Sequence, residues 1–141
     1  MPEILVKENI IVNLPSESYE EAIRRCGTML YASGYVKEPY IEGMVTRESE
    51  VSTAIGNKLA IPHGTNAVKD QVIHTGLVVL TYPDGIDWHG TEVKLVIGIA
   101  ASGDEHLGIL ANVAEAFSQE SLVDDMVNLR SVDAIYNTLA K

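Results

Sequence analysis

The stretch VKLVIGIAA, residues 93–101, is the apolar run from which the fold can be predicted. It lacks the polar–apolar alternation of a strand with one face in water, so it predicts a strand buried on both faces. Residues 73–82 are rich in β-branched side chains and predict a second strand, which ends in a turn at Pro83-Asp84-Gly85. Residues 59–62 predict a short strand, and residues 4–14 predict one or two more.

Helical periodicity is found on both sides of these strands. Apolar residues that recur every three or four positions predict helices over residues 19–33, 39–48, 103–118, 121–129 and 132–140. Ser18 and Glu21 form a capping-box pattern before the first of these helices, Ser102 and Glu105 repeat it, and Ser131 is a candidate cap of the last helix. Helices at both ends of the chain around central strands indicate a layered α/β or α+β fold.

The composition restricts both the class of protein and its partners. The length of 141 residues and the 46% hydrophobic content predict one globular domain over residues 1–141. The chain has 20 acidic and 10 basic residues, and the resulting net charge of −10 disfavours binding to nucleic acid or to an anionic membrane. Cys26 is the one cysteine, and its place on the apolar face of a helix predicts a core residue. No run resembles a membrane span or a signal-peptide core, so we expect a cytoplasmic protein.

The histidines are the first candidates for chemistry, because the usual phosphate-loop, dinucleotide, serine-hydrolase and zinc motifs are absent. His63 follows an apolar strand and stands between the rigid Pro62 and the permissive Gly64. Such a loop presents the ring to a partner, and a neutral imidazole is a competent nucleophile near pH 7. The alternative is a loop histidine without a role.

Two other residues could assist such a histidine. His106 lies in the first turn of the helix predicted over residues 103–118, where the helix dipole favours a neutral ring and the N–H groups attract anions. Arg47 lies at the end of the second helix, where a guanidinium could hold a phosphoryl group with two hydrogen bonds. The alternative is that both are ordinary helix-end residues without a role in chemistry. We interpret His74 and His89 as surface residues without a role.

Four motifs together resemble one known family. They are Arg47-Glu48, STAIG at residues 52–56, LAIPHGT at residues 59–65, and Glu105-His106-Leu107. This set resembles the enzyme IIA domain of the bacterial sugar phosphotransferase system, mannitol/fructose class. The resemblance covers nearly the whole chain, and the IPHGT loop is its most specific element.

Two further stretches bear on the branch of that family. Residues 95–106 and the segment Tyr82-Pro83-Asp84-Gly85 are most similar to the mannitol branch. The fructose and nitrogen-regulatory branches share the IPHG core.

The resemblance implies a fold, an activity and a set of site residues. The fold would be α/β, with a mixed central sheet of about four to five strands and helices on both sides. His63 would accept a phosphoryl group on Nε2 from the phosphohistidine of the carrier HPr and pass it to a cysteine of enzyme IIB. His106 would be the second active-site histidine, and Arg47 would contact the phosphoryl group. No metal or other cofactor would be needed.

Smaller contributions to phosphate binding are expected around the histidine. The backbone N–H groups at Gly64 and the hydroxyl groups of Thr53 and Thr65 are candidate donors to phosphate, and the two hydroxyls could also reach the His63 ring. Two other functions stay open at this point. One is a regulatory, nitrogen-type enzyme IIA, phosphorylated on the same histidine but acting by binding a target protein. The other is a metal-binding or hydrolytic domain built on His63 and His106.

Overall fold

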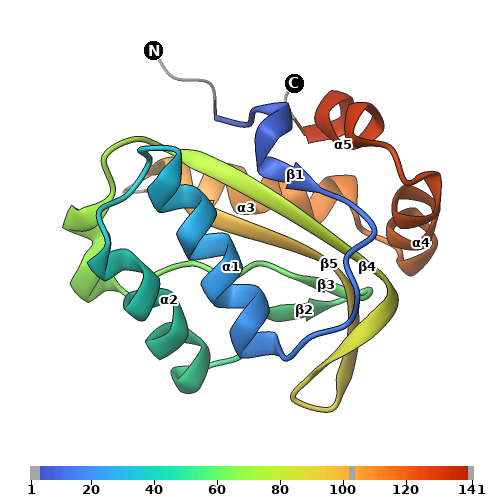
Figure 1. Ribbon diagram of the computed structural model, residues 1–141, viewed down its shortest axis with the longest axis horizontal. Helices are drawn as coiled ribbons and strands as arrows, with labels where there is room; N and C mark the ends of the chain where they lie inside the picture. Colours follow the sequence, from blue (N-terminus) through green and yellow to red (C-terminus); the bar gives the residue numbers. More distant parts are fainter. Residues whose placement is uncertain (1–3, 102–103, 140–141) are drawn as a thin grey trace.

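The computed structural model describes residues 4–101 and 104–139, and of these all side chains except those at positions 66, 69 and 104–107. Within the described residues, five strands form one mixed sheet in the order β1-β4-β5-β3-β2 (Figure 1). The strands are β1 (Ile10–Ile11), β2 (Ala54–Gly56), β3 (Leu59–Ala60), β4 (Gly76–Trp88) and β5 (Thr91–Ala100). β4 and β5 are antiparallel, whereas β1 runs parallel to β4 and β3 runs parallel to β5.

The apolar run at residues 93–101 forms most of the central strand β5, and it is buried on both faces as predicted. Its residues alternate between two cores, because successive side chains of a strand point to opposite faces. Val96 packs with the core on the side of the first two helices, whereas Ile97 and Ile99 pack with the core on the other side. The partner strand β4 alternates in the same way.

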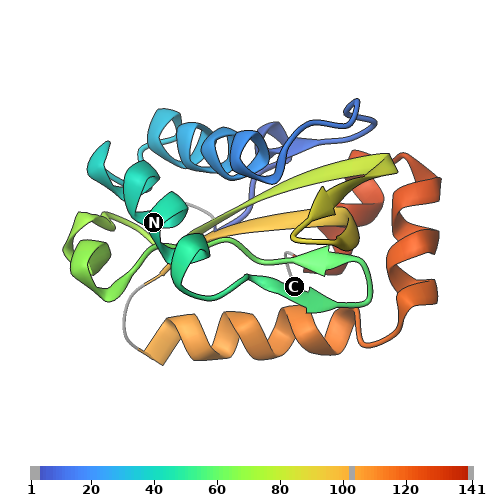
Figure 2. The ribbon, with the colours of Figure 1, turned by 90° about the horizontal axis from the view of Figure 1, so that it is seen from below.

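Helices cover both faces of the sheet, which gives three layers (Figure 2). The helices are α1 (Tyr19–Ala32), α2 (Pro39–Glu50), α3 (Asp104–Ala116), α4 (Glu120–Leu129) and α5 (Val132–Leu139). α1 and α2 supply apolar residues to one core, and α3, α4 and α5 supply them to the other. None of the described helices is both long enough and apolar enough to cross a membrane.

The helix predictions are confirmed, with shifts of one or two residues at most ends. Ser18 and Glu21 form the complete capping box, with reciprocal hydrogen bonds between each side chain and the other residue's backbone N–H. The Ser131 hydroxyl accepts a hydrogen bond from the N–H of Ala134 at 3.1 Å, as expected of a cap. The second capping pattern depends on Ser102, which lies outside the described residues.

One prediction near the strands needs correction, the prediction of one or two strands in residues 4–14 is met by a single short one, and one strand was missed. The Pro83-Asp84-Gly85 segment is no chain reversal, because β4 continues through it and the pairing with β5 only shifts register between Thr81 and Ile86. The reversal is at His89 and Gly90, whose φ angles of 54° and 88° are those of a tight two-residue hairpin turn. Residues 4–14 contain only the two-residue β1, preceded by a 3₁₀ turn, η1 (Lys7–Asn9). The strand β2 has no counterpart among the predicted elements.

The sheet topology decides where the IPHGT loop lies. The chain leaves β3 and continues alongside β5, so that His63 forms an isolated parallel bridge with Ile99. The carboxyl ends of β3 and β5 therefore meet at one edge of the sheet, and α3 begins just after β5. The 3₁₀ helix η2 (Asn66–Gln71), α2 and the first turn of α3 all lie at this end of the molecule (Figure 2).

Candidate functional site

The His63 ring is held by its own strand end. The carbonyl of Pro62 accepts a hydrogen bond from the N–H of Ile99 at 2.9 Å, which fixes the backbone just before the histidine. The Nδ1 atom of His63 lies 2.9 Å from the carbonyl oxygen of Ile61. A carbonyl can only accept, so this contact requires the proton on Nδ1 and leaves the lone pair on Nε2. The half-buried ring is thus held in the tautomer that leaves Nε2 unprotonated.

Tyr40 anchors the residue after the histidine. Its buried hydroxyl donates to the carbonyl of Ile99 and accepts from the N–H of Gly64, both at 2.9 Å. Burial raises the pKa of the Tyr40 phenol to about 12, so the group remains a neutral donor at physiological pH. The expectation that the Gly64 N–H binds phosphate does not fit this structure, because that N–H already donates to Tyr40.

Gly64 is required instead for close packing. A Cβ atom there would lie 2.6 Å from Cε1 of Tyr40 and 2.9 Å from Cγ2 of Val68. These distances are shorter than van der Waals contact, so a side chain would push the Tyr40 ring away. The glycine lets α2 approach the loop that carries His63.

Arg47 lies on the face of α2 that packs against this loop. Tyr40, Gly43 and Arg47 follow one another at intervals of three and four residues, which places them on one side of the helix. Gly43 meets η2 so closely that a Cβ there would lie 2.3 Å from Cγ2 of Val68. Arg47 is half-buried, and its Nη1 donates to the carbonyl of Val51 at 2.7 Å. That bond uses one of the five N–H donors of the guanidinium and orients the group.

Thr53 does not face the loop as expected. Its side chain is buried, and its hydroxyl donates to Oε1 of Glu48 at 2.6 Å. The hydroxyl is therefore committed to a carboxylate, and the prediction that it donates to phosphate or to the His63 ring does not match the geometry. Thr65 is half-buried, and its carbonyl accepts from the N–H of Val68 at the start of η2.

Glu48 is the residue whose importance the sequence reasoning missed. The residue as a whole is 4% exposed, and its carboxylate accepts hydrogen bonds from Thr53, from Nε1 of Trp88 and from Nε2 of His89. A signal was present, because Glu48 follows Met44 by four positions and so falls on the apolar face of α2. The prediction that His89 is a surface residue without a role is wrong in its second part, since its ring contacts this buried carboxylate.

His106, His74 and Cys26 lie in different parts of the fold. The backbone of His106 lies in the first turn of α3, which follows the same end of β5 that His63 contacts; the side chain of His106 lies outside the described residues. His74 is exposed after η2. Cys26 is fully buried as predicted, and burial raises the pKa of its thiol to about 12.

No group of three or more metal-ligating side chains is found among the described residues. A cavity of about 680 Å³ lies elsewhere, between the N-terminal segment, β4, α3 and α5. Leu5, Leu77, Val113 and Leu139 are among the residues that line it, and no candidate site residue does.

Comparison with known proteins assigns this arrangement to a family. The sequence model for the enzyme IIA type 2 component of the phosphoenolpyruvate-dependent sugar phosphotransferase system matches residues 3–141. The chain belongs to this family. A mannitol-specific phosphotransferase enzyme IIA component of Halalkalibacterium halodurans is 48% identical to it over 132 residues, which are 94% of this chain and 91% of that protein.

Solved structures agree with the fold of this enzyme IIA. The crystal structure of the mannitol enzyme IIA of Escherichia coli matches with a TM-score of 0.88 at 36% identity, over 96% of this chain and 98% of that one. The same E. coli protein in complex with phosphorylated enzyme IIB matches with a TM-score of 0.87, over 94% of each chain. The predicted α/β class, with a mixed sheet between helices, is confirmed.

Proposed function

We propose that this enzyme IIA carries a phosphoryl group on Nε2 of His63, accepts it from phosphorylated HPr and passes it to a cysteine of enzyme IIB. The observation that carries the proposal is the 2.9 Å contact between Nδ1 of His63 and the Ile61 carbonyl. It keeps the proton on one ring nitrogen and the lone pair on the other, so the nucleophile needs no general base.

Each transfer exchanges one bond to phosphorus for another. In the first step the Nε2 lone pair forms the new N–P bond while the N–P bond to the HPr histidine breaks, and that histidine keeps the electron pair. In the second step a cysteine thiolate of enzyme IIB forms an S–P bond and His63 leaves with its electron pair. Such transfers pass through a loose transition state, so positioning and stabilisation of charge on the phosphoryl oxygens supply most of the catalysis.

Arg47 and His106 are the proposed catalytic partners of His63. Arg47 shares a face of α2 with Tyr40 and Gly43 by helical spacing, and its guanidinium would bind the oxygens through its N–H groups. The first turn of α3 adds backbone N–H groups with a positive dipole end, which attract an anion and disfavour a charged imidazole at position 106. Thr65 would contribute a hydroxyl from the loop. Gly64 would contribute close packing, and Thr53 would act through Glu48.

Mannitol is the proposed sugar of the system, and the mannitol enzyme IIB is the proposed acceptor. The support is that the similar H. halodurans protein is a mannitol-specific enzyme IIA component and that the similar E. coli protein forms a complex with phosphorylated mannitol enzyme IIB. HPr as the donor follows from the phosphotransferase family. This cycle would run in the cytoplasm, where both partners would be met in solution.

Labelling from phosphoenolpyruvate tests the proposal. The wild-type protein, mixed with enzyme I and HPr, should acquire an acid-labile label, whereas His63→Ala should acquire none. His74→Ala is the matched control, since His74 is an exposed histidine in the segment between η2 and β4, and it should label normally. Full labelling of His63→Ala would disprove the site.

Onward transfer separates the proposed function from the regulatory alternative. The labelled wild-type protein is mixed with a mannitol enzyme IIB, and phosphocysteine is measured. We expect the phosphoryl group to appear on the enzyme IIB cysteine as soon as the two proteins are mixed. A protein that labels on His63 but transfers nothing to enzyme IIB would instead fit a regulatory enzyme IIA.

A further inference from the structure

Burying the carboxylate of Glu48 costs free energy, and the transfer step does not use this group directly. Its side chain is 2% exposed, and its described partners are hydrogen-bond donors rather than a lysine or arginine. Removing a carboxylate from water costs several kcal/mol unless its lone pairs are filled. Here they are filled by the N–H and hydroxyl of Thr53, by the indole of Trp88 at 3.0 Å and by His89 at 3.1 Å.

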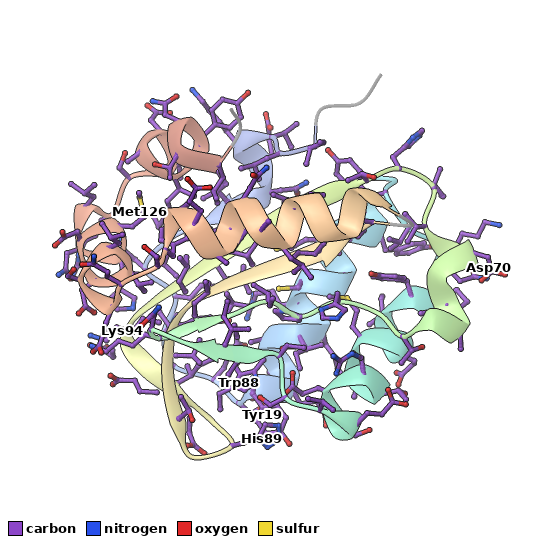
Figure 3. All side chains as sticks on the ribbon, turned by 180° about the vertical axis from the view of Figure 1, so that it is seen from behind. Tyr19, Asp70, Trp88, His89, Lys94 and Met126 are labelled. Carbon is purple, nitrogen blue, oxygen red and sulfur yellow. The ribbon has the colours of Figure 1, made fainter. Side chains whose placement is uncertain are left out.

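These donors come from two parts of the fold. Thr53 belongs to the segment between α2 and β2, whereas Trp88 and His89 close the β4–β5 hairpin. Figure 3 shows Tyr19, Trp88 and His89 gathered at one place, and the rings of Tyr19 and His89 are 4.2 Å apart between centroids. His89 keeps this contact with a φ of 54°, a conformation that glycine or asparagine adopts with less strain. The carboxylate therefore ties the end of α2 to the hairpin.

A chain of hydrogen bonds leads from Glu48 to the phosphoryl-accepting ring. The carboxylate holds the N–H of Thr53 at 3.1 Å, and the carbonyl of Thr53 accepts from the N–H of Ile61 at 3.0 Å. The carbonyl of Ile61 then accepts from Nδ1 of His63 at 2.9 Å. Thr53 and Ile61 each donate through their own N–H and accept through their own carbonyl, so holding the Thr53 backbone in place also positions the Ile61 carbonyl that accepts from His63.

The Glu48 carboxylate also affects the position of Arg47. Arg47 is the neighbour of Glu48 in α2, and its Nη1 bonds the carbonyl of Val51 in the segment that Glu48 holds through Thr53. Displacing that segment would thus move the guanidinium and the His63 ring together.

We propose that Glu48 is a positioning residue for phosphoryl transfer, which holds the His63 ring in its Nδ1–H tautomer through Thr53 and Ile61. This inference rests on the proposed role of His63 as phosphoryl acceptor. Glu48 itself touches neither the ring nor the phosphoryl group. Its effect is on the orientation and protonation of His63 and on the position of Arg47.

The test compares Glu48→Gln with Glu50→Gln, a matched change at an exposed position on the same helix. Nitrogen-15 NMR of the unphosphorylated protein reads the His63 tautomer directly, without any phosphorylation. The wild-type protein and Glu50→Gln should show Nδ1–H, whereas Glu48→Gln should show a mixture of both tautomers, since glutamine replaces one acceptor oxygen by a donor. The rate of transfer from phosphorylated HPr at saturation should fall about 10- to 100-fold, with little change in the HPr concentration at half saturation.

The outcomes separate this inference from the proposed function. A folded Glu48→Gln with an unchanged tautomer, or with an unchanged saturating rate, overturns the inference. If Glu48→Gln does not fold, Thr53→Val decides instead, because it keeps the shape and removes the hydroxyl bond that holds the Glu48 carboxylate against the Thr53 N–H. A mixed tautomer together with a slower rate supports the inference, and either measurement left unchanged overturns it. Failure of the wild-type protein to label on His63 overturns the proposed function, while the NMR comparison still reads the tautomer.

Discussion

The Nδ1 atom of His63 lies 2.9 Å from the carbonyl oxygen of Ile61, two residues earlier in the chain. The contact spans the proline of the IPHGT loop, whose own carbonyl is held by the N–H of Ile99 in the central strand. The ring is therefore oriented by the sheet itself rather than by a loop that must order when a partner binds. A nucleophile that is positioned in advance loses less entropy in the transition state.

The phosphorylated protein should carry its phosphoryl group on Nε2. The Nδ1–H bond to Ile61 can persist after the new N–P bond forms, because the two nitrogens face different groups. Nitrogen-15 and phosphorus-31 NMR of the labelled protein should show an Nε2 phosphohistidine with a protonated Nδ1. A phosphoryl group found on Nδ1 would contradict the orientation described here.

Gly64→Ala should destabilise the protein by about 1 to 3 kcal/mol, because the new Cβ would overlap the buried Tyr40 ring. Urea unfolding measures the change. Gly108→Ala is the control, since Gly108 lies on the exposed side of α3 with open space around it. That change should instead stabilise by about 0.5 to 1 kcal/mol, the helix preference of alanine over glycine. Equal effects of the two substitutions would show that the loop does not depend on close packing at position 64.

His106→Ala should leave the fold intact and slow transfer from phosphorylated HPr by about 100-fold, the usual cost of losing one group that stabilises transition-state charge. His74→Ala should transfer at the wild-type rate, because His74 is exposed. His89→Ala is unsuitable as a second control, since His89 contacts the buried Glu48. If His106→Ala and His74→Ala transfer at the same rate, position 106 has no part in the reaction.

The stability of the protein should depend on pH through Glu17. Burial alone would raise the pKa of this carboxyl, but hydrogen bonds from Arg25 and from the Tyr82 hydroxyl outweigh it and hold the pKa below its ordinary value of 4.5. A carboxyl whose pKa is lower in the folded state stabilises that state above pH 4.5, and the contribution is lost as the pH falls through the folded pKa. Glu17→Gln should thus be less stable than the wild-type protein by about 1 to 3 kcal/mol at pH 7.

Urea unfolding at pH 7, 5, 4 and 3 measures this dependence. The difference in free energy of unfolding between the wild-type protein and Glu17→Gln should shrink as the pH falls below 4.5. Tyr82→Phe removes one of the donors, so it should reduce the pH-dependent part without abolishing it. A difference that stays constant from pH 7 to pH 3 would contradict the assignment to Glu17.

Local patterns were sufficient for most of the fold and for the histidine loop. The apolar run at residues 93–101 predicted the central strand because burial on both faces leaves a signal in consecutive residues. The segment Pro83-Asp84-Gly85 has the composition of a turn, yet β5 pairs on both sides of it and absorbs it as an irregularity within β4. The three-residue strand β2 exists only through its pairing with β3, which no local pattern reports.

Part of the site depends on distant pairs and was therefore beyond local reasoning. His89 and Glu48 are 41 residues apart in sequence, and only the position of the β4–β5 hairpin brings them together. Thr53 was predicted to donate to phosphate or to the His63 ring, and no local pattern indicated Glu48 as its partner. Its burial and its bond to Glu48 decide this, because a residue that is 2% exposed does not present its hydroxyl to a phosphoryl group delivered from outside.

Arg47→Lys should slow transfer at least tenfold although the positive charge is kept. A lysine ammonium is a point donor and cannot reproduce the planar fork that bonds the Val51 carbonyl and still presents further N–H groups to phosphoryl oxygens. Arg24→Lys is the matched control, because Arg24 lies on the surface of α1 and pairs there with Glu20 and Glu42. Rapid mixing with phosphorylated HPr measures both rates. Equal rates for the two variants would show that Arg47 does not bind the phosphoryl group. The first turn of α3 would then be the remaining candidate for stabilising the charge on the phosphoryl oxygens.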